Sequence, residues 1–280
     1  MPSSSPPLTT EPQIMGIVNL NDDSFSGDGS LSVGQEIEKS IQFCRDGADF
    51  IDLGAESART NREAISIEEE IGRLVPFLEQ FPAALDAAGL SNPLISINSW
   101  RPEVLAALMP YGIDLINDIG GLPDGDFRNA ELAVEYHSSL LIMHTVGLPK
   151  VAHTHQVWDQ VLDSIEAFFE EKVRGCETLG LPREQIVLDP GIDFAKQRDD
   201  NLRIYRDLAR FKERFGCRIL LPVSRKTVIG DVLDLPDPKD RDAGTVACIT
   251  RGLTQGADIF RVHHVKAAQQ AVQMIRALSR

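Results

Sequence analysis

Short apolar runs alternate with longer amphipathic segments along most of the chain. Eight of these runs are five to seven residues long and nearly continuously apolar, and they lie at residues 13–19, 48–54, 93–98, 114–118, 139–144, 185–189, 218–224 and 257–263. Unbroken rather than alternating hydrophobicity is typical of parallel strands that are covered on both faces. We therefore predict eight buried parallel strands.

The segments between the predicted strands have the spacing of amphipathic helices. Ile37, Ile41 and Cys44, for example, follow one another at intervals of four and three residues, which places them on one helical face. Longer helices are predicted at residues 67–90, 157–179, 201–215 and 266–278. Pro82 lies within the first of them and is expected to end or kink it, because proline cannot donate the backbone hydrogen bond of a helix interior.

Eight strands, each followed by a helix and with no linker between them, predict a single (β/α)8 barrel, the TIM-barrel fold. A doubly wound open sheet is the alternative, but it favours a GxGxxG turn after the first strand, and the chain has none there. We assign residues 13–280 to one barrel domain. Residues 1–12 are rich in Ser, Pro and Thr, so we expect a disordered tail there.

Composition narrows the possible partners. The 280 residues carry a net charge of −14, which argues against a nucleic-acid surface. No stretch approaches the roughly 20 apolar residues of a membrane span, and the first residues lack the apolar core of a signal peptide. The four cysteines are widely spaced without a CxxC pair, which argues against a disulfide framework. We expect a cytoplasmic protein that binds neither nucleic acid nor membrane.

Polar residues gather where the predicted strands end. In a (β/α)8 barrel the active site lies at the C-terminal ends of the strands. The polar residues at these ends are Asn19, Asp52, Glu56, Asn98, Asn117, Asp118, His144, Asp189, Ser224, Arg225, Lys226, Arg261 and His263. Amides and carboxylates therefore share one rim with a small group of cations.

One part of this rim suits a flat heterocycle. Asn98, Asn117 and Asp189 follow the third, fourth and sixth predicted strands. Their amides and carboxylate can match an edge of alternating hydrogen-bond donors and acceptors. Asn117 taken alone would equally suit a turn.

Another part suits an anion. Arg261 and His263 are two residues apart on the last predicted strand, so both point to the same face. With Asn19, and with a bound metal, they could hold a negatively charged group. Lys226 begins a predicted helix, where a cation is electrostatically unfavourable, and this placement favours a functional role.

Several polar residues have simpler interpretations. For Asp52 and Asp118 we favour hydrogen bonding to loop backbone over ligand binding. His153 and His155 form an HxH pair in the loop after the fifth predicted strand. Because no second His-rich segment accompanies them, we interpret them as solvated loop residues rather than a zinc site.

Six segments resemble, in order, the motifs of the dihydropteroate synthase family. They are IMGIVNLNDDSFSGDG (14–29), GADFIDLGAESAR (47–59), LINDIGG (115–121), LDPGIDFAK (188–196), SRKTVIG (224–230) and RDAGTV with GADIFRVHHV (241–265). The resemblance is collinear and covers residues 13 to about 278. The family fold is a TIM barrel, in agreement with the strand count.

The resemblance implies a transferase of folate biosynthesis. Such an enzyme condenses 6-hydroxymethyl-7,8-dihydropterin pyrophosphate with p-aminobenzoate and releases pyrophosphate, with Mg²⁺ as cofactor. The implied catalytic residues are Lys226, Arg261 and His263. The implied pterin-binding residues are Asn98, Asn117, Asp189 and Lys226. The pyrophosphate site would comprise Asn19, Arg261 and His263, with Asn19 also near Mg²⁺. The arylamine site would comprise Phe25, Arg59 and Ser224.

The implied chemistry is a dissociative substitution. Pyrophosphate leaves first, and the amine then captures the cationic pterin methylene. Catalysis would be electrostatic, because cations stabilise the departing anion and acidic groups near the ring stabilise the cation. No side-chain nucleophile is needed. The resemblance also implies a homodimer.

The chain departs from the family pattern at several positions. After the first strand Asn21 and Asp22 replace Thr-Pro, and in the second motif Ala55 replaces a glycine. Ala58, Thr60 and Asn61 replace Thr, Pro and Gly of the same motif. After the third strand Asn98 replaces an aspartate, which removes a negative charge beside a ring that must become cationic.

These departures leave four functions open. The chain is a divergent synthase, a related enzyme with a different amine acceptor, a pterin-binding protein with little catalysis, or a pterin-dependent corrinoid methyltransferase. The segments 224–226 and 261–263 favour a synthase that releases pyrophosphate over methyl transfer.

Overall fold

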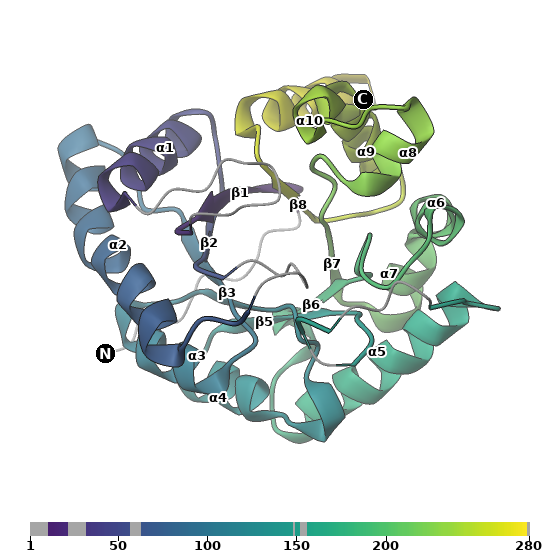
Figure 1. Ribbon diagram of the computed structural model, residues 1–280, viewed down its shortest axis with the longest axis horizontal. Helices are drawn as coiled ribbons and strands as arrows, with labels where there is room; N and C mark the ends of the chain where they lie inside the picture. The colour runs from purple at the N-terminus through teal and green to yellow at the C-terminus, as the bar shows by residue number, and fades with distance from the viewer. Residues whose placement is uncertain (1–10, 22–31, 57–62, 148, 152–155, 279–280) are drawn as a thin grey trace.

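A closed parallel barrel forms the centre of the molecule. The computed structural model describes residues 11–21, 32–56, 63–147, 149–151 and 156–278. Within them the strands pair in chain order and the eighth pairs with the first (Figure 1). The strands are β1 (Gln13–Asn19), β2 (Phe50–Gly54), β3 (Leu94–Asn98), β4 (Leu115–Asp118), β5 (Ser139–Met143), β6 (Ile186–Asp189), β7 (Arg218–Leu221) and β8 (Ile259–Val262). The predicted (β/α)8 barrel is confirmed.

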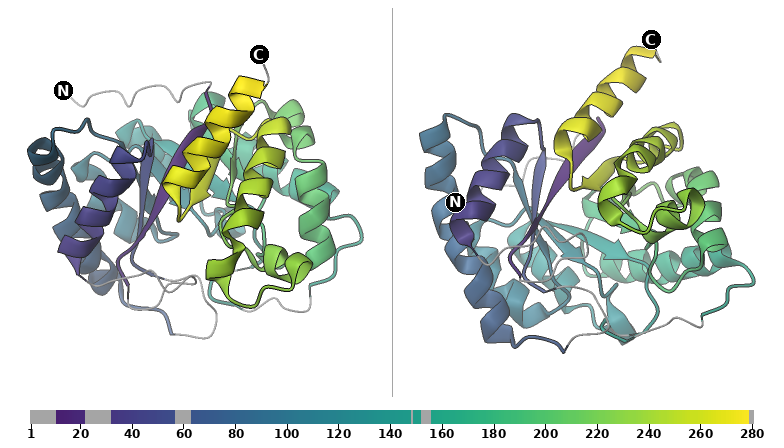
Figure 2. Two further views of the ribbon diagram at one scale, coloured as in Figure 1. Left: turned by 90° about the horizontal axis from the view of Figure 1, so that it is seen from above. Right: turned by 45° about the horizontal axis from the view of Figure 1, so that its top comes forward.

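Helices form an outer ring around the strands (Figure 1). They are α1 (Val33–Arg45), α2 (Ile67–Ala88), α3 (Pro102–Leu108), α4 (Arg128–Tyr136), α5 (Val161–Thr178), α6 (Arg198–Arg206), α7 (Ala209–Phe215), α8 (Thr227–Leu233), α9 (Asp242–Thr254) and α10 (Val265–Leu278). α10 packs beside β1 and α9 and so closes the ring (Figure 2). No helix in the described ranges is both long and apolar enough to cross a membrane.

Two predicted helices differ from the observed ones. The predicted helix at 201–215 is divided into α6 and α7, because Asp207 leaves the helical region at φ −119° and ψ 24°. α2 does not end at Pro82 but continues through it to Ala88. Its apolar stripe is buried against the barrel, and this burial offsets the backbone hydrogen bonds that its prolines cannot donate. The buried apolar residues of α2 are Leu74, Phe77, Leu78, Phe81 and Leu85.

Apolar side chains plug the inside of the barrel. They come from inward-facing positions of the strands and are Met15, Phe50, Leu115, Leu141, Val187, Leu220 and Ile259. Ile119 and Met143 belong to the same cluster and also line a cavity at the mouth. A ligand can therefore enter only above this plug, at the C-terminal ends of the strands.

Strand register brings the polar strand ends to one level. Asn19 pairs with Gly54 across β1 and β2, and Asn98 pairs with Asn117 across β3 and β4. These pairings explain why residues far apart in the sequence meet at one rim. Residues 1–10 lie outside the described ranges, so the expected tail stays a prediction.

Candidate functional site

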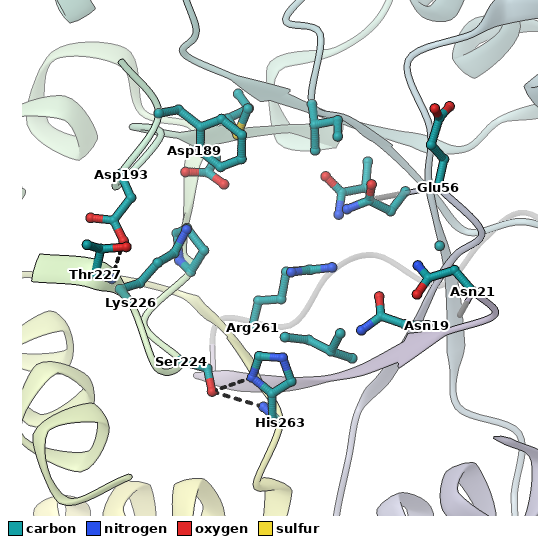
Figure 3. Close-up of a pocket in the computed structure, with 18 residues that line it drawn as sticks. Asn19, Asn21, Glu56, Asp189, Asp193, Ser224, Lys226, Thr227, Arg261 and His263 are labelled. Atoms are coloured by element: carbon teal, nitrogen blue, oxygen red, sulfur yellow. Dashed lines mark hydrogen bonds between the residues drawn. The ribbon is translucent and has the colours of Figure 1, made fainter. Parts of the chain in front are cut away.

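A cavity of about 290 Å³ opens at the C-terminal ends of the strands. Figure 3 shows the side chains that surround it. Eight predicted site residues line it: Asn19, Asn98, Asn117, Asp189, Ser224, Lys226, Arg261 and His263. The predicted arylamine residues Phe25 and Arg59 lie outside the described residues, as do His153 and His155.

Asp52 is the buried centre of a network beneath the cavity. Its carboxylate accepts hydrogen bonds from Arg261 Nε at 2.7 Å, Ser96 Oγ at 2.6 Å and Asn117 Nδ2 at 3.0 Å. The preferred prediction that Asp52 bonds loop backbone is therefore wrong. On β2 it bonds side chains of β3, β4 and β8 instead. Asp52 thereby orients two predicted ligand-binding residues, one on each side of the cavity.

For Asp118 the same prediction is confirmed. Its carboxylate accepts hydrogen bonds from the backbone N–H groups of Gly120, Gly121 and Leu122. It also accepts one from Asn129 Nδ2. Asp118 therefore holds the loop after β4 and lies outside the cavity lining.

Asp189 ends β6 and faces the cavity (Figure 3). Its Oδ1 accepts a hydrogen bond from Gly191 N at 2.7 Å. Burial raises its pKa to about 6, while the charges of Lys226, Lys196 and Arg261 act in the opposite direction. The group is thus a carboxylate above about pH 6 and can then accept two parallel N–H bonds from a ligand.

Asp189→Asn is expected to weaken pterin binding by about tenfold or more, because an amide N–H would oppose a ligand N–H. Wild-type affinity should fall as pH drops through about 6, where the carboxylate protonates, whereas the variant should show no such step. Calorimetric titration with a pterin at several pH values measures both effects. An unchanged dissociation constant would exclude this role for Asp189.

The same substitution should not destabilise the fold. Asp189 has a raised pKa in the folded state, so its ionisation opposes folding above about pH 6 and has no effect below about pH 4. The amide oxygen of the introduced asparagine can still accept from Gly191 N. The melting temperature of the variant should therefore equal or exceed that of the wild type at about pH 8 and lose this advantage towards about pH 4.

The ammonium group of Lys226 lies on the side of the cavity that the β6–α6 loop forms. Its Nζ donates to Ile192 O at 2.8 Å and lies 5.1 Å from the centre of the Phe194 ring. Burial lowers its pKa. A helix N-terminus is stabilised by a negative charge. At α8 Asp193 supplies this charge, because its carboxylate accepts the N–H of Thr227. The cation that is unfavourable at this helix start thus contacts the β6–α6 loop.

The opposite side of the cavity combines Arg261, His263 and Ser224 (Figure 3). Ser224 Oγ lies 2.7 Å from His263 Nδ1 and accepts the backbone N–H of His263 at 3.2 Å. A serine hydroxyl that donates to Nδ1 places the proton of a neutral imidazole on Nε2. Arg261, fixed by Asp52, extends its guanidinium into the same space (Figure 3). The arrangement offers N–H donors and positive charge to an anion.

Asn19 and Asn98 flank Gly54 on the remaining wall. A Cβ at Gly54 would lie 3.5 Å from Asn98 Cβ and 3.9 Å from Asn19 Oδ1, so glycine leaves space between the two amides. Among the described residues no group of three or more His, Cys, Asp or Glu side chains could hold a metal. One amide oxygen from Asn19 nevertheless fits Mg²⁺, which commonly keeps several waters and takes its other ligands from substrate phosphates.

Sequence reasoning missed part of the lining. Asp193, Phe194 and Thr227 line the cavity, but the first two come from the β6–α6 loop and Thr227 begins α8, so none of them ends a strand. Their position in the sequence could have indicated them, because each lies within five residues of Asp189 or beside Lys226. The other residues not predicted for the site are Ile17, Asn21, Gly54, Ile119, Met143 and Pro222, whereas Glu56, which the sequence identifies as a polar strand end, also lines the cavity.

Comparisons with known proteins agree with this geometry. The model of the pterin binding enzyme family matches residues 15–263. A dihydropteroate synthase from Synechocystis sp. is 36% identical over 95% of this chain and 90% of its own. A crystal structure of dihydropteroate synthase from Clostridium difficile, in the presence of pteroic acid, has a TM-score of 0.84 and 33% identity over 96% of this chain and 97% of its own. A Xanthomonas albilineans dihydropteroate synthase with 4-aminobenzoic acid also has a TM-score of 0.84, at 28% identity over 96% and 93%. The chain belongs to the dihydropteroate synthase family of pterin-binding enzymes.

Proposed function

We propose that the protein condenses 6-hydroxymethyl-7,8-dihydropterin pyrophosphate with p-aminobenzoate and releases pyrophosphate. The observation that carries this proposal is the division of one cavity into two sides. Asn98, Asn117 and Asp189 form a side for a heterocycle, whereas Arg261 and His263 form a side for an anion. A pterin pyrophosphate has both parts in one molecule.

On the pterin side, Asp189 accepts two N–H bonds from the amino-pyrimidine edge of the ring. Lys226 and Asn117 supply N–H donors to its acceptor atoms, and both are already oriented by Ile192 O and Asp52. Phe194 offers an apolar surface to the ring face. The ring is thus fixed by the protein before the reaction begins.

On the anion side, Arg261, His263 and Asn19 bind the pyrophosphate. Mg²⁺, held by Asn19 and the phosphate oxygens, would neutralise further negative charge on the leaving group. The contact of Arg261 with Asp52 holds its guanidinium in place, so little reorganisation is needed as charge develops on the anion.

The reaction breaks the bond between the pterin methylene and the pyrophosphate oxygen, which leaves with the electron pair. The methylene carbon becomes cationic, and the nitrogen of p-aminobenzoate attacks it and then loses a proton. Arg261 and His263 stabilise the departing anion. Asp189, as a carboxylate, stabilises the cation. Ser224 lines the cavity and would border the arylamine, as the family resemblance also implies for Phe25 and Arg59, which lie outside the described residues.

Release of pyrophosphate from the two substrates tests the function directly. A synthase should release one pyrophosphate per dihydropteroate formed, and release should depend on p-aminobenzoate. Binding of the pterin pyrophosphate without turnover would favour a pterin-binding protein, and turnover with other arylamines alone would favour a different acceptor. The substitution of Asn98 is the observation that favours weak catalysis.

We also propose a cytoplasmic homodimer. Met274 and Leu278 are 57% and 70% exposed on α10, and burial against a second copy would remove this apolar surface from water. Cys44, Cys176, Cys217 and Cys248 are free thiols, as suits a reducing compartment. Sedimentation at twice the 30.9 kDa chain mass would support the dimer, whereas sedimentation at the chain mass would exclude it.

A further inference from the structure

The loop between β6 and α6 makes several of the contacts on the pterin side. Gly191 N donates to Asp189, and Ile192 O accepts from Lys226 Nζ. Asp193 accepts from the first N–H of α8, and Phe194 lies under the ammonium group of Lys226. The path of this loop therefore determines the shape of the pocket.

Lys196 is a residue of this loop, but it does not line the cavity. It is only 7% exposed. Its Nζ lies 2.9 Å from His144 Nδ1 and donates to Gly191 O and Phe194 O, both at 3.0 Å. A fourth and more distant acceptor is His144 O at 3.5 Å, so four acceptors surround a group that carries three protons when charged. The two carbonyls belong to the loop, and His144 follows β5 at its rim.

The loop is pressed against the end of β5. Gly191 has φ +69°, and a Cβ there would lie 2.0 Å from His144 O, so glycine is required. Trp158 packs against the His144 ring at 5.5 Å, and its Nε1 donates to Ala195 O at 2.7 Å. Lys196 therefore attaches the loop to His144 at the end of β5. Trp158, from the segment between β5 and α5, attaches the loop through Ala195.

We propose that Lys196 is a positioning residue, whose side chain ties the β6–α6 loop to His144 and thereby holds Phe194 and the Lys226 contact in place for the pterin. This inference rests on the proposed pterin site. It predicts that Lys196 affects the pterin side of the cavity and spares the anion side. Arg261 and His263 are held by Asp52 and Ser224, which Lys196 does not contact.

The charge of Lys196 is secondary to its geometry. Burial lowers its pKa to about 7; Asp189, Asp193 and Asp200 raise the pKa, and Lys226 lowers it further. The neutral amine keeps two N–H donors for the loop carbonyls and can accept Nδ1–H from His144. The same contacts can therefore form in both protonation states.

Lys196→Met tests the inference, because methionine fills the space without donating hydrogen bonds. The chain has two tryptophans, so a Trp100→Phe background leaves Trp158, which donates to Ala195 O of the loop, as the fluorescent reporter of its position. Lys212→Met is the matched control. Lys212 also donates to a backbone carbonyl, Gly256 O, but it contacts Asp258 at the opposite end of the barrel. Lys196→Gln, which retains two N–H donors, guards against a methionine variant that does not fold.

In Lys196→Met we expect red-shifted Trp158 emission and stronger acrylamide quenching, with an affinity for 6-hydroxymethylpterin reduced by about tenfold or more. The affinity for inorganic pyrophosphate should change by less than about twofold. Lys196→Gln should recover part of the pterin affinity, and Lys212→Met should match the wild type in all three measurements.

Unchanged Trp158 emission and pterin affinity in Lys196→Met would overturn the inference, as would an equal loss of pterin and pyrophosphate binding. Failure of the wild type itself to bind the pterin would overturn the proposed function instead. The Trp158 signal would then still decide whether Lys196 holds the loop.

Discussion

Arg261→Ala is expected to lower the rate of pyrophosphate release by about 10²–10³-fold, because one preoriented cationic donor to the developing anion is lost. The affinity for inorganic pyrophosphate should fall as well, while the affinity for a pterin without phosphates should change little. Steady-state kinetics and calorimetric titrations with the two ligands measure these effects. A variant that binds pyrophosphate as tightly as the wild type would place the anion site elsewhere.

Arg261→Ala should also lower the stability of the fold, although Arg261 lies at the rim of the barrel. Asp52 has no exposed surface and would lose its ion pair with Arg261, while keeping the hydrogen bonds from Ser96 and Asn117. Leaving a buried acceptor short of a partner costs about 1–3 kcal/mol. The double variant Asp52→Asn/Arg261→Ala removes the buried charge too. It should regain stability without regaining activity, which separates the two effects.

The barrel could be predicted from the sequence because its strands are buried on both faces. Each predicted run contains one strand, and the first, 13–19, matches β1 at both ends. The predicted runs differ from the observed strands only in where they begin and end. The run 218–224 extends beyond β7, which ends at Leu221, because Pro222 has no N–H with which to continue the ladder. At this strand end the missing N–H of a proline, and not the length of the hydrophobic run, determines where the strand stops.

The site could be predicted where it depends on strand ends and not where it depends on pairing between elements. Arg261 and His263 follow from strand alternation alone. The partner of Arg261, Asp52, lies 209 residues away, and only barrel closure between β8 and β1 brings the two together. Hydrophobic pattern carries no information about such contacts. The path of the β6–α6 loop likewise depends on His144, which follows β5.

A second ion-pair network on the rim illustrates the same limit. Arg101 bridges the buried carboxylates of Glu56 and Glu70 at 2.7 and 2.8 Å, and Lys150 approaches Glu56 at 3.0 Å. The four residues come from segments after β2, β3 and β5 and from α2. The sequence identifies Glu56 only as a polar strand end. Its partners show that it ties three segments of the rim together.

Asn98 is the departure with the largest expected consequence. It ends β3 in register with Asn117 and lines the cavity, where the family resemblance implies a carboxylate. The neighbouring carboxylates do not replace that charge. Asp52 is paired with Arg261, and Asp189 lies among Lys226, Lys196 and Arg261. The β3 side of the cavity therefore offers an amide dipole where the proposed reaction would create positive charge.

Asn98→Asp is expected to raise turnover with p-aminobenzoate by about tenfold or more, because a carboxylate stabilises the cation formed as pyrophosphate leaves. Substrate affinity should change less than turnover, since the added charge acts on the transition state more than on the bound substrate. Asn117→Asp is the matched control: it places a second carboxylate beside Asp52, whose Oδ1 now accepts from Asn117 Nδ2, and it should lower rather than raise turnover. A new carboxylate near Asp189 can raise the pKa of both groups, so kcat and kcat/KM should be measured across pH, and the gain should be largest where both are ionised. A wild type that already turns over rapidly, with Asn98→Asp neutral or harmful, would mean that Asp189 and the ring's other partners stabilise the cation without help from β3.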